Sequence, residues 1–174
     1  SFQPDPGNGT RVKFEFIGEG IRQITGYGPG EFNEAVWDSL IQESHLVGEL
    51  AGYPWKEAIH RVRSGESQTW KCEFRIRARD GATHWVFESA VELRDESGIS
   101  HGSIGLFQDI TERKQTERLQ ESIYEIARAA MITQSLNELY TKIHEVLQGL
   151  LPTKYFYIAL YDQEQDLLSF PYFQ

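Results

Sequence analysis

The sequence predicts an α+β fold, in which an antiparallel sheet with short flanking helices leads directly into a long charged helix. Three observations indicate this class. Residues Trp70 to Ala78 alternate between apolar and charged side chains, the period of a half-buried strand. The dipeptide Asp80-Gly81 follows, and it is a strong signal for a tight hairpin. Finally, a strand pattern passes into a charged helical one at Asp109 to Lys114.

The hairpin signal makes the next strand antiparallel to the first. That second strand runs from His84 to about Leu93 and ends in a polar turn at 95–98. A third strand, from about Ser100 to Ile110, completes a meander. Upstream, residues Val12 to Ile17 form a further strand candidate, and short helical segments are expected between residues 31 and 63.

This order of elements, with the segment WKCEFRIRARDGATHWVFESAVELRDESGISHGSIGLFQDITERK at its end, resembles the PAS sensor domain of the fold-3 type. The resemblance covers roughly residues 11–115. It rests on the Arg-Asp-Gly hairpin, the Trp-Val that follows, the Asp-Ile-Thr-Glu-Arg-Lys exit, and Gly26 to Phe32, which matches the family's turn into a helix. It implies a five-stranded antiparallel sheet. The match weakens between Gln42 and Pro54, so irregular helices are expected there.

The remaining residues have a different pattern. Ser135 to Glu138 form a Ser-x-x-Glu capping box before a helical apolar spacing that Pro152 ends. A strand from Tyr155 to Tyr161, a polar turn at 162–166 and a second strand from Leu167 to Phe173 follow. This segment resembles the opening helix and first two strands of a GAF domain, so we expect the 174 residues to be a piece of a longer receptor.

The predicted organisation has four parts. Residues 1–10 form a flexible leader, 11–111 the PAS domain, 112–133 a signalling helix, and 134–174 the start of a GAF domain. The resemblance implies a sensor module of a bacterial signal receptor that is not itself an enzyme. Histidine kinases and diguanylate cyclases both carry such arrays, so both remain open as the output domain.

Composition restricts the partners. The net charge of −9 does not favour a polyanion, so we expect no nucleic acid as a partner. No run of 18 apolar residues is present, so this segment is expected to make no membrane contact. The single cysteine forms no intrachain disulfide, which agrees with a cytoplasmic location.

Cofactor chemistry has little support in the residues. The five histidines and Cys72 show no metal-binding spacing, so no metal site is predicted. Some PAS domains bind haem through a helix histidine, which leaves His45 and His60 as candidates, with His60 on the solvated face of its helix. The flavin-binding helix motif with a reactive cysteine is missing, and Cys72 lies on a strand as a small core residue. We expect no coloured cofactor.

An unidentified small organic ligand is compatible with the resemblance, because PAS domains commonly bind one between the sheet and the helices. The candidate lining residues are placed on one sheet face by alternation: Phe74, Ile76, Phe87, Ser89, Ile104 and Leu106. Two alternatives stay open. The opposite phase of the strands is the buried one, or the core is fully packed and holds no ligand.

The exit residues Asp109, Ile110, Thr111 and Glu112 are the expected signal-transmission site. Asp109 is predicted to cap the first amides of the helix, with Glu112 reaching back and the Thr111 hydroxyl binding in the same turn. An ordinary helix cap is the alternative. In relatives, this motif passes a change in the sheet to the helix.

The charged helix carries a short apolar seam at 4-3-4 spacing, formed by Leu119, Ile123, Ile126 and Ala130. The seam predicts a parallel coiled coil in a homodimer, although two heptads are too few for strong association alone. Packing of the seam on its own PAS domain is the alternative. A dimerising scaffold that senses nothing is the competing function, and the downstream output domain is the expected partner within the chain.

Overall fold

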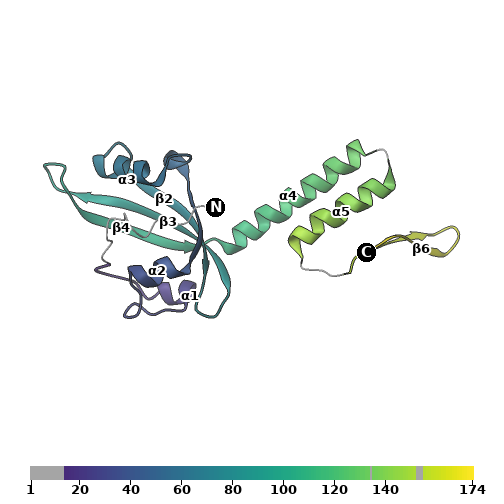
Figure 1. Cartoon of the computed structure of the whole chain (residues 1–174), viewed down its shortest axis with the longest axis horizontal. Coiled ribbons are helices and arrows are strands. Elements are labelled where there is room, and N and C mark those ends of the chain that lie inside the picture. Colours follow the sequence, from purple (N-terminus) through teal and green to yellow (C-terminus); the bar gives the residue numbers. More distant parts are fainter. Residues whose placement is uncertain (1–13, 134, 152–154) are drawn as a thin grey trace. The chain divides into compact units, whose positions relative to one another are not determined.

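The computed structural model describes residues 14–133, 135–151 and 155–174. The chain divides after Glu112 into two compact units, each of which is described here by itself. The first unit contains a four-stranded antiparallel sheet, and its strands follow one another in both sequence and space (Figure 1). These strands are β1 (Ile41–Leu46), β2 (Thr69–Arg77), β3 (Thr83–Arg94) and β4 (Ser100–Asp109).

The α+β class and the meander of β2, β3 and β4 are confirmed. The start of the sheet differs from expectation. The predicted strand at Val12 to Ile17 begins outside the described residues, and Phe14 to Ile17 are not in a strand. Instead, β1 forms where irregular helices were expected, and the described sheet has four strands rather than five.

Strand β1 forms because its apolar residues fit the neighbouring strand rather than a helix. Leu46 lies opposite Cys72 and Ser44 opposite Phe74, so the inward side chains of β1 join the apolar row of β2. A register shift between Ile41 and Glu43 interrupts the pairing near its beginning. Tertiary pairing therefore overrides the weak local signal of this segment.

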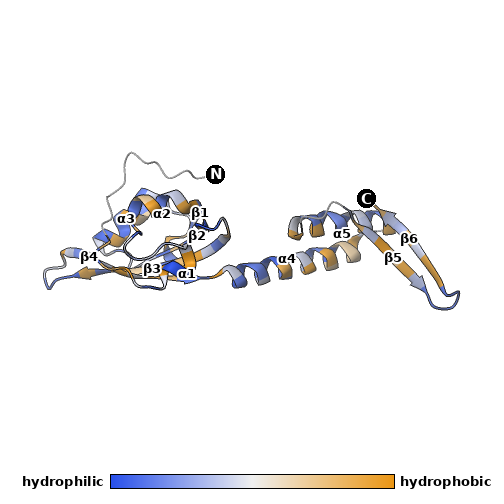
Figure 2. Cartoon of the chain, turned by 90° about the horizontal axis from the view of Figure 1, so that it is seen from below, coloured by the Kyte–Doolittle hydropathy of each residue, from blue (hydrophilic) through white to orange (hydrophobic). Residues whose placement is uncertain are grey.

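Short helices cover one face of the sheet. They are α1 (Ile21–Thr25), α2 (Glu34–Leu40), the 3-10 helix η1 (Gly48–Leu50) and α3 (Trp55–Ser64). Asn33 caps α2 by accepting a hydrogen bond from the Val36 amide at 3.0 Å. The rings of Trp37 in α2 and Trp55 in α3 both contact Phe74, so both helices pack on the same side (Figure 2).

The turn at Gly26 ties the helices to the β2–β3 loop. Gly26 has φ +79°, and a Cβ there would lie 2.9 Å from the Cβ of Arg79, so a side chain is excluded. The carboxylate of Glu31 accepts from the Gly28 amide and from Arg79, both at 3.0 Å. These contacts lower the pKa of Glu31, the Gly28 hydrogen bond most of all. The family-like turn at Gly26 to Phe32 thus has a structural role.

The second unit consists of helix and hairpin. Helix α4 (Thr111–Ile132) starts at the boundary between the units. Helix α5 (Leu136–Leu150) follows after a break between the two helices, and Gln134 in that break lies outside the described residues. Strands β5 (Tyr157–Asp162) and β6 (Leu167–Phe173) form the predicted hairpin. Ser135 stands at the cap of α5, but its side chain makes no capping hydrogen bond, so that part of the capping-box prediction is wrong.

The hairpin contacts α5 through aromatic rings, chiefly that of His144. The His144 ring stacks on Phe156 with centroids 4.9 Å apart, and its Nδ1 lies 2.9 Å from the Tyr172 hydroxyl. Several apolar side chains of the hairpin are exposed in the described structure, among them Tyr157 and Phe170. Figure 2 shows hydrophobic residues along β5 and β6. Pro152, the predicted end of α5, lies outside the described residues.

Candidate functional site

The junction between sheet and exit helix is short and closely held. Strand β4 ends at Asp109 and α4 begins at Thr111, so Ile110 alone connects them. The Ile110 side chain is buried, and its amide donates to the Trp85 carbonyl of β3 at 2.8 Å. The helix therefore starts directly from a residue bonded to the neighbouring strand.

Asp109 joins three elements through one carboxylate. Oδ1 accepts a hydrogen bond from the Thr111 amide at 2.8 Å, as expected of a residue that caps α4. Oδ2 lies 2.8 Å from Nδ1 of His84 at the start of β3. Burial alone would raise the pKa of Asp109, but the hydrogen bonds from Thr111 and the pairing with His84 outweigh it, so the pKa lies below its ordinary value.

Thr111 also binds the sheet. Its Oγ1 accepts a hydrogen bond from the Trp85 amide at 2.9 Å, and its side chain hydrogen-bonds to Asp109 as well, so the hydroxyl serves both the predicted turn and β3. Trp85 thus contacts both Ile110 and Thr111 through its backbone. Glu112 lies exposed in the first turn of α4, where its negative charge favours the helix N-terminus.

Sequence reasoning missed the strand residues that receive these contacts. His84 and Trp85 lie at the beginning of β3, opposite the end of β4, because the hairpin between them is antiparallel. Their position directly after the Asp80-Gly81 turn was the available signal. In an antiparallel hairpin, a residue near the start of the first strand lies beside the end of the second strand.

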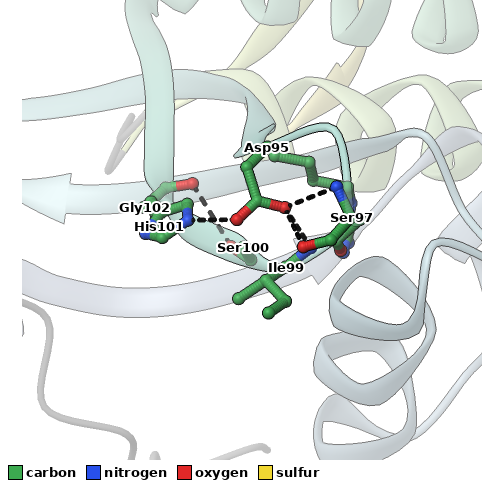
Figure 3. Close-up of polar contacts among 8 residues, drawn as sticks. Asp95, Ser97, Ile99, Ser100, His101 and Gly102 are labelled. Atoms are coloured by element: carbon green, nitrogen blue, oxygen red, sulfur yellow. Dashed lines mark hydrogen bonds and ion pairs between the residues drawn. The ribbon is translucent and has the colours of Figure 1, made fainter.

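A second carboxylate organises the other end of the β3–β4 hairpin (Figure 3). Asp95 accepts hydrogen bonds from the Ser97 amide and hydroxyl at 2.9 and 2.6 Å, and from the Ile99 amide at 3.0 Å. Its other oxygen lies 2.7 Å from Nε2 of His101. These bonds, chiefly that from the Ser97 hydroxyl, lower the pKa of Asp95 to about 2.

The six predicted pocket residues do not share a face. Phe74 lies opposite the buried Val86, so Phe74 and Ile76 face the helices. Phe87 follows Val86 directly in β3, so its side chain points to the other face of the sheet. Ser89 pairs with Leu106 on that opposite face, where Ile104 and Leu106 are exposed. The prediction that all six residues line one face is therefore wrong. On β3 and β4, the residues that face the helices are those of the opposite phase, which the sequence analysis had kept as an alternative.

Glu88, an acidic residue of β3 that the sequence reasoning did not single out, faces the helices. Glu88 lies opposite Cys72, and its Oε2 accepts from the Trp70 indole at 2.8 Å. Burial raises the pKa of Glu88, while the indole hydrogen bond opposes that effect. Cys72 is fully buried, and burial raises its pKa, so its thiol is a core group.

The histidines considered for haem lie away from the core. His45 is on β1, where its ring stacks on Trp85 at 6.1 Å, and His60 is on the exposed side of α3. Within the described residues, no cluster of three or more histidine, cysteine or acidic side chains is placed to hold a metal ion. The described helices also include none that combines the length and apolar character of a membrane span.

The predicted seam of α4 is largely exposed. Leu119, Ile123 and Ala130 are exposed in the described chain, whereas Ile126 is half-buried. Ala129, one position from the seam, is the residue of α4 that is most deeply buried. The seam thus presents apolar side chains that the second unit itself leaves largely uncovered.

Comparison with known proteins identifies the class. A family model described as the PAS fold matches residues 14–107, more than half of the chain, so the chain belongs to the PAS fold family.

The curated relatives include two sensors. The chain is 30% identical over 162 residues to the "Methyl sulfide methyltransferase-associated sensor" of Methanosarcina acetivorans, covering 90% of this chain and 15% of that protein. It is 28% identical over 94 residues to the "Two-component sensor PprA" of Pseudomonas aeruginosa, covering 45% of this chain and 10% of that protein. The chain thus spans a small part of both relatives.

A solved structure titled "Sensory Box Histidine Kinase/Response Regulator", from Burkholderia thailandensis E264, is similar at TM-score 0.43 and 22% identity. The similarity covers 65% of this chain and 81% of that one.

Proposed function

We propose that this chain is a regulatory sensor module, in which a ligand- or partner-dependent change in the PAS sheet passes through α4 to downstream domains. The observation that carries the proposal is the junction, where Trp85 binds both Ile110 and Thr111. A displacement of β4 against β3 has to break or move these bonds. Because only Ile110 separates β4 from α4, little flexible chain is available to absorb that movement.

The two curated relatives support this proposal. Both relatives are named as sensors. The longer alignment covers 162 residues, so it extends beyond the PAS match at residues 14–107. From the sequence resemblance of residues 134–174, we also propose that the segment after α4 opens a GAF domain, with a histidine kinase or diguanylate cyclase domain as output. The present segment is proposed to be non-catalytic and without a coloured cofactor.

The experiment uses the complete receptor with its own output assay. Asp109→Ala removes the acceptor of the Thr111 amide and the partner of His84, so output is expected to become independent of the stimulus. Asp162→Ala is the matched control, because Asp162 accepts two backbone amides in the β5–β6 turn of the second unit and makes none of the junction's hydrogen bonds. Stimulus-dependent output that persists in Asp109→Ala would reduce the junction to an ordinary helix cap.

The second candidate is a dimerising scaffold that has no ligand of its own. The exposed apolar side chains of Leu119 and Ile123 on α4 favour it. A thermal-shift screen against small organic compounds separates the two functions, because a compound that binds the native state raises the melting temperature. A reproducible increase would support sensing by ligand, and dimerisation without any such increase would support the scaffold.

A further inference from the structure

Two histidines lie against aspartates at opposite ends of the β3–β4 hairpin. At the exit, His84 Nδ1 is 2.8 Å from Asp109 Oδ2, and at the turn, His101 Nε2 is 2.7 Å from Asp95 Oδ2 (Figure 3). The arrangement is reciprocal, because β4 carries the aspartate of the first pair and the histidine of the second. Strand β4 is thus tied at both ends to β3 or to the turn that follows it.

Both aspartates are charged acceptors near neutral pH. The pKa of Asp95 is about 2, and that of Asp109 lies below its ordinary value. Histidine is the side chain whose charge normally changes between pH 5 and 8. In that interval both carboxylates stay ionised.

Other charges around the first pair do not replace the aspartate. On β2, His84 lies opposite the apolar Ile76, while Arg75 and Arg77 are on the other face of the strand. The acidic residue of the first helical turn of α4 is Glu112, which has the same sign as the aspartate.

Arg94 and Glu92, which flank the second pair on β3, have other partners. Arg94 donates to the Gly98 carbonyl and to two backbone carbonyls at the end of α3. Glu92 accepts a hydrogen bond from the Ser100 hydroxyl. The carboxylate that His101 meets is therefore that of Asp95.

Building on the proposed function, we propose that protonation of His84 and His101 tightens β4 against β3 and thereby makes proton concentration an input to the exit helix. A neutral imidazole can only donate an uncharged N–H hydrogen bond to the aspartate. A protonated imidazole forms a charge-assisted hydrogen bond, which is shorter and stronger. The additional attachment is present when the imidazoles are protonated and is lost when they are neutral.

The expected effect is modest because the pairs are partly exposed. The side chains of His84 and Asp109 are 25% and 38% exposed, and that of His101 is 65% exposed. Exposed ion pairs of this kind change a local equilibrium by roughly two- to fivefold. The exit pair is expected to lie toward the upper end of this range and the turn pair toward the lower end.

Amide hydrogen exchange of the 174-residue protein tests the inference at each end separately. The Ile110 amide, bonded to the Trp85 carbonyl, reports on the exit, and the Ile99 amide, bonded to Asp95, reports on the turn. After correction for intrinsic exchange, protection at both amides is expected to be two- to fivefold greater at pH 6 than at pH 8.

Glutamine variants assign the effect to the histidines. Glutamine stays uncharged and can still donate a hydrogen bond to the aspartate. His84→Gln is expected to remove the pH dependence at Ile110 alone, and His101→Gln that at Ile99 alone. His60→Gln is the control on the exposed side of α3 and should leave both intact. If glutamine disturbs folding at position 84, His84→Arg keeps the charge and should give high protection at both pH values.

Two outcomes would overturn the proposal: equal protection at pH 6 and 8 in the unmodified protein, or pH dependence that survives in the double glutamine variant. In the complete receptor, output should depend on pH in the unmodified protein and lose that dependence in the double variant. If the double variant still responds to pH while Asp109→Ala abolishes the response to stimulus, the proton input is wrong and the transmission role stands. If Asp109→Ala has no effect on output, the proposed function fails, whatever the exchange experiment shows.

Discussion

Asp109→Ala in the 174-residue protein is the most direct probe of how the exit helix is held. The substitution removes the acceptor of the Thr111 amide, a loss of about 1 kcal/mol for a helix cap. It also removes the pair with His84. Because those side chains are 25% and 38% exposed, solvent screening limits that contribution to about 0.5 kcal/mol. The first unit should therefore lose about 1.5 kcal/mol of unfolding free energy.

Thermal and urea unfolding measure this loss. For a unit of roughly 100 residues, about 1.5 kcal/mol corresponds to a melting temperature lower by roughly 6–12 °C. Asp109→Asn retains an oxygen acceptor for the Thr111 amide and lacks the charge, so it should lose only about 0.5 kcal/mol. Asp162→Ala, in the second unit, should leave the melting of the first unit unchanged.

The two aspartate variants also show which interaction matters. If Asp109→Ala costs less than about 0.3 kcal/mol, the carboxylate does not hold the junction, and the bonds of Trp85 to Ile110 and Thr111 are sufficient. If Asp109→Asn costs as much as Asp109→Ala, the charge and the pair with His84 dominate, and the attribution of most of the stability to the cap is refuted.

Three further predictions concern assembly and acid stability. Ile123→Glu should weaken self-association in light scattering by placing a charge in the exposed seam. Tyr124→Glu, which is exposed on α4 outside the seam, should not. An unchanged mass for Ile123→Glu would exclude the seam as a dimer contact. Deleting all residues after Pro152 should leave the first unit folded at nearly the same melting temperature. Self-association should fall, because the apolar surface of the hairpin is removed. Unfolding of the shortened protein would show that the division of the chain into two units is misplaced. The β3–β4 turn should keep its structure as the pH falls below 3.8 and lose it only near pH 2. The reason is that the pKa of Asp95 is depressed in the folded state, so the hydrogen bonds to its carboxylate are lost only when that carboxylate is protonated. Carbon-13 titration of the Asp95 carboxyl group measures this pKa, and a midpoint near 3.8 would contradict the prediction.

Local sequence signals predicted the elements that depend on neighbours along the chain. The alternation from Trp70 to Ala78 and the Asp80-Gly81 turn identified β2, β3 and their antiparallel pairing. The change to a charged helical pattern placed the start of α4 within a residue or two. The helix of His60, with its buried and solvated sides, was also predicted, because a period of 3.6 residues is visible in sequence.

Register could not be obtained in the same way. Alternation shows that Phe87 and Ser89 share a face, but it does not show whether Phe74 joins them. The β2–β3 pairing sets Phe74 opposite Val86, and a shift of one residue reverses the face of every side chain in a strand. The predicted pocket mixed two faces for this reason.

The sequence by itself determined the period of each strand, the hairpin turns and the position of the exit motif, because these depend on residues close together in the chain. Only the tertiary structure decided that residues 41–46 pair as β1, that Glu88 faces the helices, and that His84 meets Asp109. His84 and Asp109 are 25 positions apart, and their contact depends on the length of both hairpin arms and on their register. Contacts between distant residues are set by how the strands pair, which no local pattern specifies.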